Sequence, residues 1–89
     1  MPERVATIGS ASGLHARPAA LFTQAAAAAG HEVSIAREGG PAVPAASVLM
    51  VMSLGLKQGD QVVLSAPDEA AGAALADLAD LLARDLDAQ

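Results

Sequence analysis

Two alanine-rich segments constrain the fold of this 89-residue chain more than any other feature. The first spans residues 16–29 and is followed by Gly30, and the second begins at Pro67-Asp68-Glu69 and runs into residues 70–83. Alanine is the best helix former, glycine favours helix ends, and acidic residues favour helix starts. The second segment also repeats leucine at helical spacing, at Leu75, Leu78, Leu82 and Leu86. The sequence therefore predicts two helices, the later one with an apolar stripe that packs on a sheet.

Short segments between and around these helices have the composition of strands. Residues 4–8, 32–37 and 61–66 are rich in β-branched or alternating apolar residues, with Val62 and Leu64 expected on one face. Residues 41–44 contain two prolines and can form only a short edge strand. Ser47 stands at an N-cap position before a compact apolar run, 48–54, which Gly55 ends, so this run predicts a short helix.

The resulting element order is βαββαβα, which predicts an α+β fold. We expect a two-layer open-faced β-sandwich, in which three helices cover one face of a four-stranded antiparallel sheet. The length of 89 residues favours a single domain, 1–89, whose core is aliphatic because Phe22 is the one aromatic residue.

Charge and composition exclude several classes of function. The net charge is −5 and the five basic residues are dispersed, so a nucleic-acid partner is not expected. The chain has no cysteine, so cysteine usage does not mark a redox compartment. The opening residues contain neither a signal-peptide core nor the roughly 20 apolar residues of a membrane helix. We therefore expect a cytoplasmic protein without membrane insertion.

The chemistry of the chain is concentrated in the segment Gly13-Leu14-His15-Ala16-Arg17-Pro18-Ala19. It places His15 at the start of the first predicted helix, where unpaired backbone amides and the helix dipole favour an anion. The planar guanidinium of Arg17 can pair with phosphate oxygens, so a phosphoryl group on the His15 ring would find donors already in place.

Three other readings of His15 remain open at this point. The residue can simply cap a helix, with Arg17 in solvent. A metal site is disfavoured because the other histidine, His31, lies beyond the far end of the same helix and is expected to be an ordinary surface residue. A hydrolytic triad with Ser12 lacks an acidic residue to orient the ring.

The segment GLHARPA, together with Ala-Ser-Val-Leu-Met-Val-Met-Ser-Leu-Gly at residues 46–55, resembles the HPr family of phosphocarrier proteins of the phosphoenolpyruvate-dependent sugar phosphotransferase system. The resemblance covers essentially the whole chain. It implies that His15 accepts a phosphoryl group, on Nδ1, from enzyme I and passes it to the A components of sugar-specific permeases. Arg17 would stabilise the phosphoryl oxygens and Ser12 would border the site. Such a protein is a stoichiometric carrier, not an enzyme, and needs no cofactor or metal.

The resemblance also implies a docking surface beside the histidine. It comprises residues of the first helix and of the short apolar helix, namely Ala20, Leu21, Gln24, Val48, Leu49 and Met52. Ser47 corresponds to the serine that a dedicated kinase phosphorylates in some members, although Ala46, Met50 and Pro44 depart from the pattern of those members. An N-cap role for Ser47 is at least as well supported.

Two alternatives to a sugar-uptake carrier follow from the same resemblance. One is a regulatory module on the same fold, which the presence of His15 and Arg17 disfavours. The other is a specialised carrier for a nitrogen-related relay or a dihydroxyacetone kinase, which these residues do not distinguish. A monomer is the simplest state for a carrier with transient partners.

Overall fold

The sheet of this protein is built from four short strands that all pair antiparallel. The computed structural model describes residues 2–84. The strands are β1 (Glu3–Thr7), β2 (Ser34–Arg37), β3 (Val43–Pro44) and β4 (Gln61–Ser65), and their order across the sheet is β1-β4-β2-β3. The predicted edge strand is therefore present, but it is reduced to two residues, since Pro44 cannot donate to a ladder.

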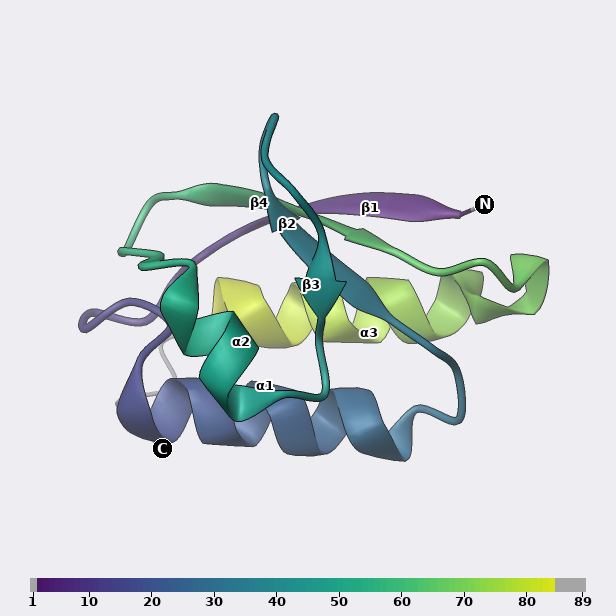
Figure 1. Ribbon diagram of the computed structural model, residues 1–89, viewed down its shortest axis with the longest axis horizontal. Coiled ribbons are helices and arrows are strands. Elements are labelled where there is room, and N and C mark those ends of the chain that lie inside the picture. Colours follow the sequence, from purple (N-terminus) through teal and green to yellow (C-terminus); the bar gives the residue numbers. More distant parts are fainter. Residues whose placement is uncertain (1, 85–89) are drawn as a thin grey trace.

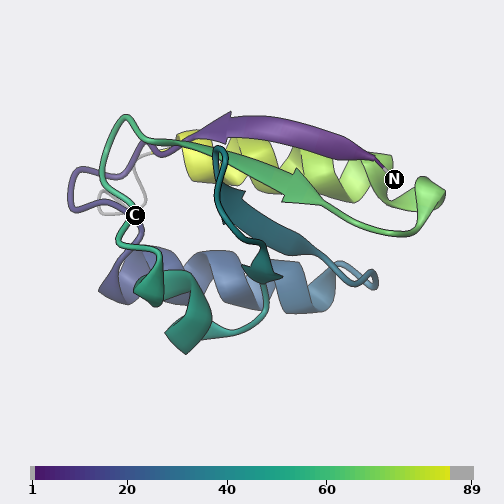
Figure 2. The ribbon, with the colours of Figure 1, turned by 45° about the horizontal axis from the view of Figure 1, so that its top comes forward.

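The helices α1 (Ala16–Ala28), α2 (Val48–Ser53) and α3 (Gly72–Ala83) cover one face of this sheet (Figure 1). Helices α1 and α3 lie side by side, and α2 packs against α1 near β3. Seen from a second direction, no helix within residues 2–84 covers the other face of the sheet (Figure 2). The predicted α+β, two-layer open-faced sandwich is confirmed.

One connected core lies between the sheet and the helices. Val62 and Leu64 of β4 are fully buried and point to the same side, as their alternation predicts. They meet Phe22 of α1 and the predicted stripe of α3, of which Leu75, Leu78 and Leu82 are buried. Leu86, the fourth member of that stripe, lies outside the described residues. Val5 is 58% exposed because it faces the uncovered side of the sheet.

The start of the last helix differs from the prediction. Residues Glu69–Ala71 form a 3-10 turn, η1, and regular α-helix begins only at Gly72. Asp68 caps the turn, since its Oδ1 accepts a hydrogen bond from the Ala70 amide at 2.8 Å. Its other oxygen lies 3.1 Å from Nδ1 of His31, which follows α1. The expectation that His31 is an ordinary surface residue missed this contact between the ends of two elements.

Two loops at the opposite end of the molecule pack against each other and position the segment before α1. The amide of Leu14 donates to the carbonyl of Leu56 at 3.1 Å, and the amide of Gly59 donates to the carbonyl of Ile8 at 2.8 Å. Gly13 has φ of +78°, and a Cβ atom at this position would lie 2.9 Å from the Lys57 Cα and closer still to the Leu56 carbonyl. The absence of a side chain at Gly13 thus permits the close approach of the two loops.

The substitution Gly13→Ala should destabilise the protein by about 2–3 kcal/mol, because it combines an unfavourable φ with a backbone clash. Gly59→Ala is a matched control: Gly59 has φ of +91°, but nothing lies within 4 Å of an added Cβ. Gly59→Ala should lower the free energy of unfolding by about 1 kcal/mol, because it introduces the unfavourable φ without a clash. Urea unfolding measures the free energy of unfolding of both variants. Equal losses of stability would show that the close approach of the two loops at Gly13 contributes nothing to the cost of Gly13→Ala.

The Asp68 carboxylate should make stability depend on pH. The hydrogen bond from the Ala70 amide, and to a smaller extent His31, holds the pKa of Asp68 below its usual 3.8 against the opposing effect of desolvation. Its stabilising contribution is therefore present above pH 3.8 and is lost as the pH falls through the lower folded-state pKa. In urea unfolding, wild type should exceed Asp68→Asn at neutral pH, and the difference should shrink in acid. Asp77→Asn controls for the loss of a negative charge, and a pH-independent difference at position 68 would contradict the prediction.

Candidate functional site

His15 lies at the junction between the 9–14 loop and helix α1. It is the N-cap residue, with φ of −140° and ψ of 153°, and its ring makes no cap hydrogen bond to the helix. A turn in which the Gly13 amide donates to the Ser10 carbonyl at 2.9 Å precedes it, and the adjacent Leu14 is buried. Leu14 is buried, and the His15 side chain that follows it is exposed.

The first turn of α1 supplies groups that attract an anion to this position. The amides of Ala16 and Arg17 belong to the first turn, and such amides have no partner within a helix. Pro18 has no amide hydrogen, and a first-turn position suits it for that reason. The Arg17 side chain is exposed, so its guanidinium can approach a group held on His15. Helix dipole, amides and cation all favour a phosphoryl group here.

Ser12 is also exposed, in the same loop as His15. The three residues predicted for phosphoryl chemistry thus lie within one six-residue segment, 12–17, and are exposed near the start of α1. This arrangement leaves the His15 ring accessible to a second protein. A site for catalysis on a small molecule would instead be expected to lie in a cleft.

The backbone of Ala16 adds a feature that sequence reasoning missed. Its φ is +50°, and among non-glycine residues of the described chain this positive value is found at Ala16 alone. Left-handed backbone costs a residue with a Cβ about 1–2 kcal/mol and requires support from its surroundings. The loop contacts that hold Leu14 supply such support. No local sequence signal marks the position, because alanine favours ordinary helical angles.

The apolar surface beside the histidine comes mainly from α2. Leu49 is 79% exposed, and Val48 and Met50 are each 41% exposed, whereas Val51 is buried. Large exposed apolar side chains in a row are unusual on a protein without a partner. Of the docking residues expected on this helix, Met52 is half-buried and packs against the core, while Met50, which was not expected, is exposed.

The α1 part of the expected docking surface lies next to α2, which packs against this helix. Gln24 is exposed, and Ala20 and Leu21 are half-exposed. Helix α1, which carries Ala20, Leu21 and Gln24, packs against α2, which carries Val48 and Leu49. Exposed or half-exposed apolar side chains predominate among these residues, and the exposed Met50 of α2 is of a type that adapts to different partners.

Ser47 has the structural role that its position predicts. Its hydroxyl oxygen accepts a hydrogen bond from the Met50 amide at 3.3 Å and so caps α2. The side chain is half-buried, and Val48 after it is exposed. The predicted cap is confirmed.

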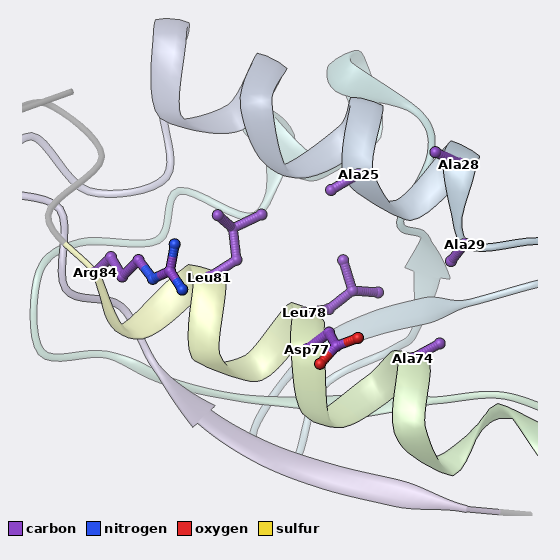
Figure 3. A pocket seen from close by; sticks show the side chains of 8 residues that line it. All are labelled: Ala25, Ala28, Ala29, Ala74, Asp77, Leu78, Leu81 and Arg84. Carbon is purple, nitrogen blue, oxygen red and sulfur yellow. The ribbon is translucent and has the colours of Figure 1, made fainter.

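A hollow between α1 and α3 lies apart from these residues (Figure 3). Its volume is about 490 Å3, and it is lined by Ala25, Ala28, Ala29, Ala74, Asp77, Leu78, Leu81 and Arg84. None of these residues belongs to the predicted site. Within residues 2–84, no three histidine or acidic side chains gather closely enough to hold a metal ion. The same part of the chain contains no helix with the length and apolar character needed to span a membrane.

Comparisons with known proteins agree with this geometry. The family model described as the PTS HPr component phosphorylation site matches residues 2–84. A curated phosphocarrier protein HPr of Streptomyces coelicolor is 48% identical over 87 residues, which are 98% of this chain and 94% of the relative.

Solved structures show the same relationship. A crystal structure of a phosphocarrier protein HPr from Bacillus anthracis superposes with a TM-score of 0.82 at 31% identity, and the match covers 90% of this chain and 94% of the other. An HPr dimer from Thermoanaerobacter tengcongensis gives a TM-score of 0.61 at 41% identity, again over 90% and 94% of the two chains. This protein belongs to the HPr family, the phosphocarrier proteins of the phosphotransferase system.

Proposed function

We propose that this protein accepts a phosphoryl group on His15 from phospho-enzyme I, which obtains it from phosphoenolpyruvate, and donates it to the A component of a sugar-specific permease. The observation that carries the proposal is the exposed His15 ring at the N-terminal end of α1. A nitrogen lone pair at this place can attack a phosphorus atom presented by another protein, and the resulting negative charge lies beside the helix amides.

Each transfer exchanges one bond to phosphorus for another. The His15 nitrogen forms a bond to phosphorus while the bond to enzyme I breaks, and the electron pair of that bond stays with enzyme I. In the second transfer the acceptor attacks, and the electron pair returns to the His15 ring. The protein ends each cycle unchanged and serves as a stoichiometric carrier between two catalytic partners. It requires no cofactor or metal of its own for these steps.

Arg17 and Ser12 act on the phosphorylated state in this proposal. A phosphoryl group on nitrogen carries negative charge on its terminal oxygens, and the Arg17 guanidinium can donate charge-assisted hydrogen bonds to them. Ser12 borders the group from the 9–14 loop. Because both side chains are exposed, they can stabilise the group without enclosing it. The next acceptor therefore retains access.

Both partners would dock on the apolar surface of α2 and the adjoining part of α1. Val48, Leu49 and Met50 supply exposed apolar area, and Gln24 is an exposed polar residue of the adjoining helix α1. An interface of this kind can form and dissociate in each cycle, because it consists of a few side chains around one central residue, Leu49. Met52 contributes less to it than its position in the sequence predicts.

Sugar uptake is the context that the family supports, and a nitrogen-related or dihydroxyacetone relay is the alternative. Partner choice depends on the same surface of α1 and α2, so a panel of purified A components would distinguish these contexts. Phosphorylation of Ser47 by a kinase stays a prediction from the family resemblance, as do the cytoplasmic location and the monomeric state. The cap contact to Met50 gives Ser47 a role that needs no kinase.

His15→Ala should abolish phosphoryl acceptance and leave the fold intact, because the side chain is exposed and makes no cap hydrogen bond. The measurement is incubation with enzyme I, magnesium and labelled phosphoenolpyruvate, with the label located by nitrogen NMR and acid lability. Unfolding midpoints serve as the control for folding. Retained labelling of the variant would remove His15 from the mechanism.

Arg17→Ala should slow transfer from phospho-enzyme I by about 10- to 100-fold, since a hydrogen bond to a charged group contributes ~1.5–3 kcal/mol. Arg17→Lys preserves the charge but not the planar fork, and should lose less. Initial rates of label transfer measure both variants, with urea unfolding to verify that each remains folded. An unchanged rate in Arg17→Ala would mean that the guanidinium does not contact the phosphoryl group.

A further inference from the structure

Arg37, the last residue of β2, binds both ends of the segment that follows α2. Its Nη2 donates to the carbonyl oxygens of Leu54 at 2.8 Å and Gly55 at 3.1 Å. Its Nη1 donates to Oδ2 of Asp60 at 3.2 Å, and the two groups form an ion pair. Residues 54–60, here the 54–60 loop, are thus joined to the sheet at their start and at their end by one guanidinium.

At its start, the 54–60 loop ends helix α2. Leu54 is the C-cap of α2, and Gly55 follows with φ of +62°. The last carbonyls of a helix have no intrahelical donor, and a cation near them is favoured by the helix dipole. With one nitrogen, Arg37 satisfies such an oxygen at Leu54 and also binds the carbonyl oxygen of Gly55, which follows the helix. Its planar fork suits this arrangement better than a lysine ammonium, which is a single point charge.

At its other end, the loop is closed by Asp60. Oδ2 of Asp60 accepts the Lys57 amide at 2.9 Å as well as the Arg37 guanidinium, and the Asp60 amide donates to the Lys57 carbonyl at 3.0 Å. The hydrogen bond from the Lys57 amide, and secondarily Arg37, lowers the pKa of Asp60 below its usual value despite desolvation. The carboxylate therefore stays ionised and available to Arg37 near neutral pH.

The inner side of the 54–60 loop supports the segment that carries His15. The carbonyl of Leu56 accepts the Leu14 amide at 3.1 Å. The side chain of Gln58 donates from Nε2 to the carbonyl of Gly9 at 3.1 Å. One short loop therefore touches the residue directly before His15 and, at its other side, the helix of the docking surface.

We propose that Arg37 is a positioning residue for phosphoryl transfer, which fixes helix α2 and the His15 segment relative to each other through the 54–60 loop. The inference deepens the proposed function and rests on it. A partner must contact Leu49 while its own reacting atom meets His15. The distance between Leu49 and His15 in the carrier therefore has to match the spacing of the corresponding groups on the partner. If the distance between Leu49 and His15 varies in the free carrier, ordering it costs free energy on binding, and the affinity for the partner falls.

The exposure of the Arg37–Asp60 pair indicates that it positions α2 more than it stabilises the fold. The side chains of Arg37 and Asp60 are 45% and 31% exposed, and ion pairs in such surroundings add little to stability. Helix α2 is retained independently by Val51, which is fully buried, and by packing on α1. Loss of Arg37 should therefore loosen the placement of α2 and leave the fold in place.

The test is the steady-state kinetics of enzyme I with Arg37→Ala as the phosphoryl acceptor. We expect KM for the carrier to rise about 3- to 10-fold, the effect of immobilising one or two side chains on docking, with kcat within about twofold of wild type. Arg37→Lys should recover part of the loss. Arg4→Ala is the matched control, because it removes an exposed arginine from β1, at the opposite edge of the sheet from β3 and α2. Unchanged KM in Arg37→Ala, or a fall in kcat with no change in KM, would overturn the inference.

Amide hydrogen exchange provides a readout that needs no phosphoryl transfer. In Arg37→Ala the Leu14 amide, which donates to Leu56, should exchange faster, and it should keep its wild-type rate in Arg4→Ala. If wild-type protein accepts no label, the proposed function fails, and exchange still decides whether Arg37 couples the two regions. If wild type accepts label and Leu14 exchange is the same in both variants, the coupling is absent and only the present inference fails.

Discussion

The contact between the 9–14 loop and the 54–60 loop is the constraint on which the site depends. Its central hydrogen bond, from the Leu14 amide to the Leu56 carbonyl, forms only because Gly13 has no side chain to separate the two backbones. Leu14 is then buried, His15 is turned outward, and α1 begins immediately afterwards. The same contact supports the left-handed backbone of Ala16, whose strain a free loop would relieve by changing its conformation.

Local sequence signals account for most of the fold. Alanine content, alternation and the Ser47 cap locate the helices and strands within a few residues, and Val62 and Leu64 are buried together as their period requires. What the sequence could not predict depends on contacts between distant residues. The contact between His31 and Asp68 joins residues 37 positions apart and has no local signal in the sequence. The hydrogen bonds of Arg37 likewise join positions 17, 18 and 23 residues apart.

The candidate site divides in the same way. His15 and Arg17 could be selected as candidates from sequence because they lie in one short motif whose chemistry suits a phosphoryl group, whereas Ser12 was added from the family resemblance. The docking face of α2 could not be assigned fully, since a run of six mostly apolar residues does not reveal which side faces the core. Burial of Val51 fixes that rotation. It places Leu49 on the opposite side, turns Met52 partly inward and leaves Met50 exposed, which the spacing alone did not indicate.

A carrier must present a reactive group to two different proteins, and this requirement explains why stability and reactivity are separated in the molecule. The core is aliphatic, with Phe22 as its one aromatic ring, and none of the residues expected to touch phosphate belongs to it. A phosphoryl group on a buried ring would be out of reach of the second protein, and its charge would cost much more to hold away from water. Exposure removes both difficulties but gives up the rigidity of a cleft. The 54–60 loop, which Arg37 holds, contacts the backbone of the 9–14 loop and supplies that rigidity without covering the His15 ring.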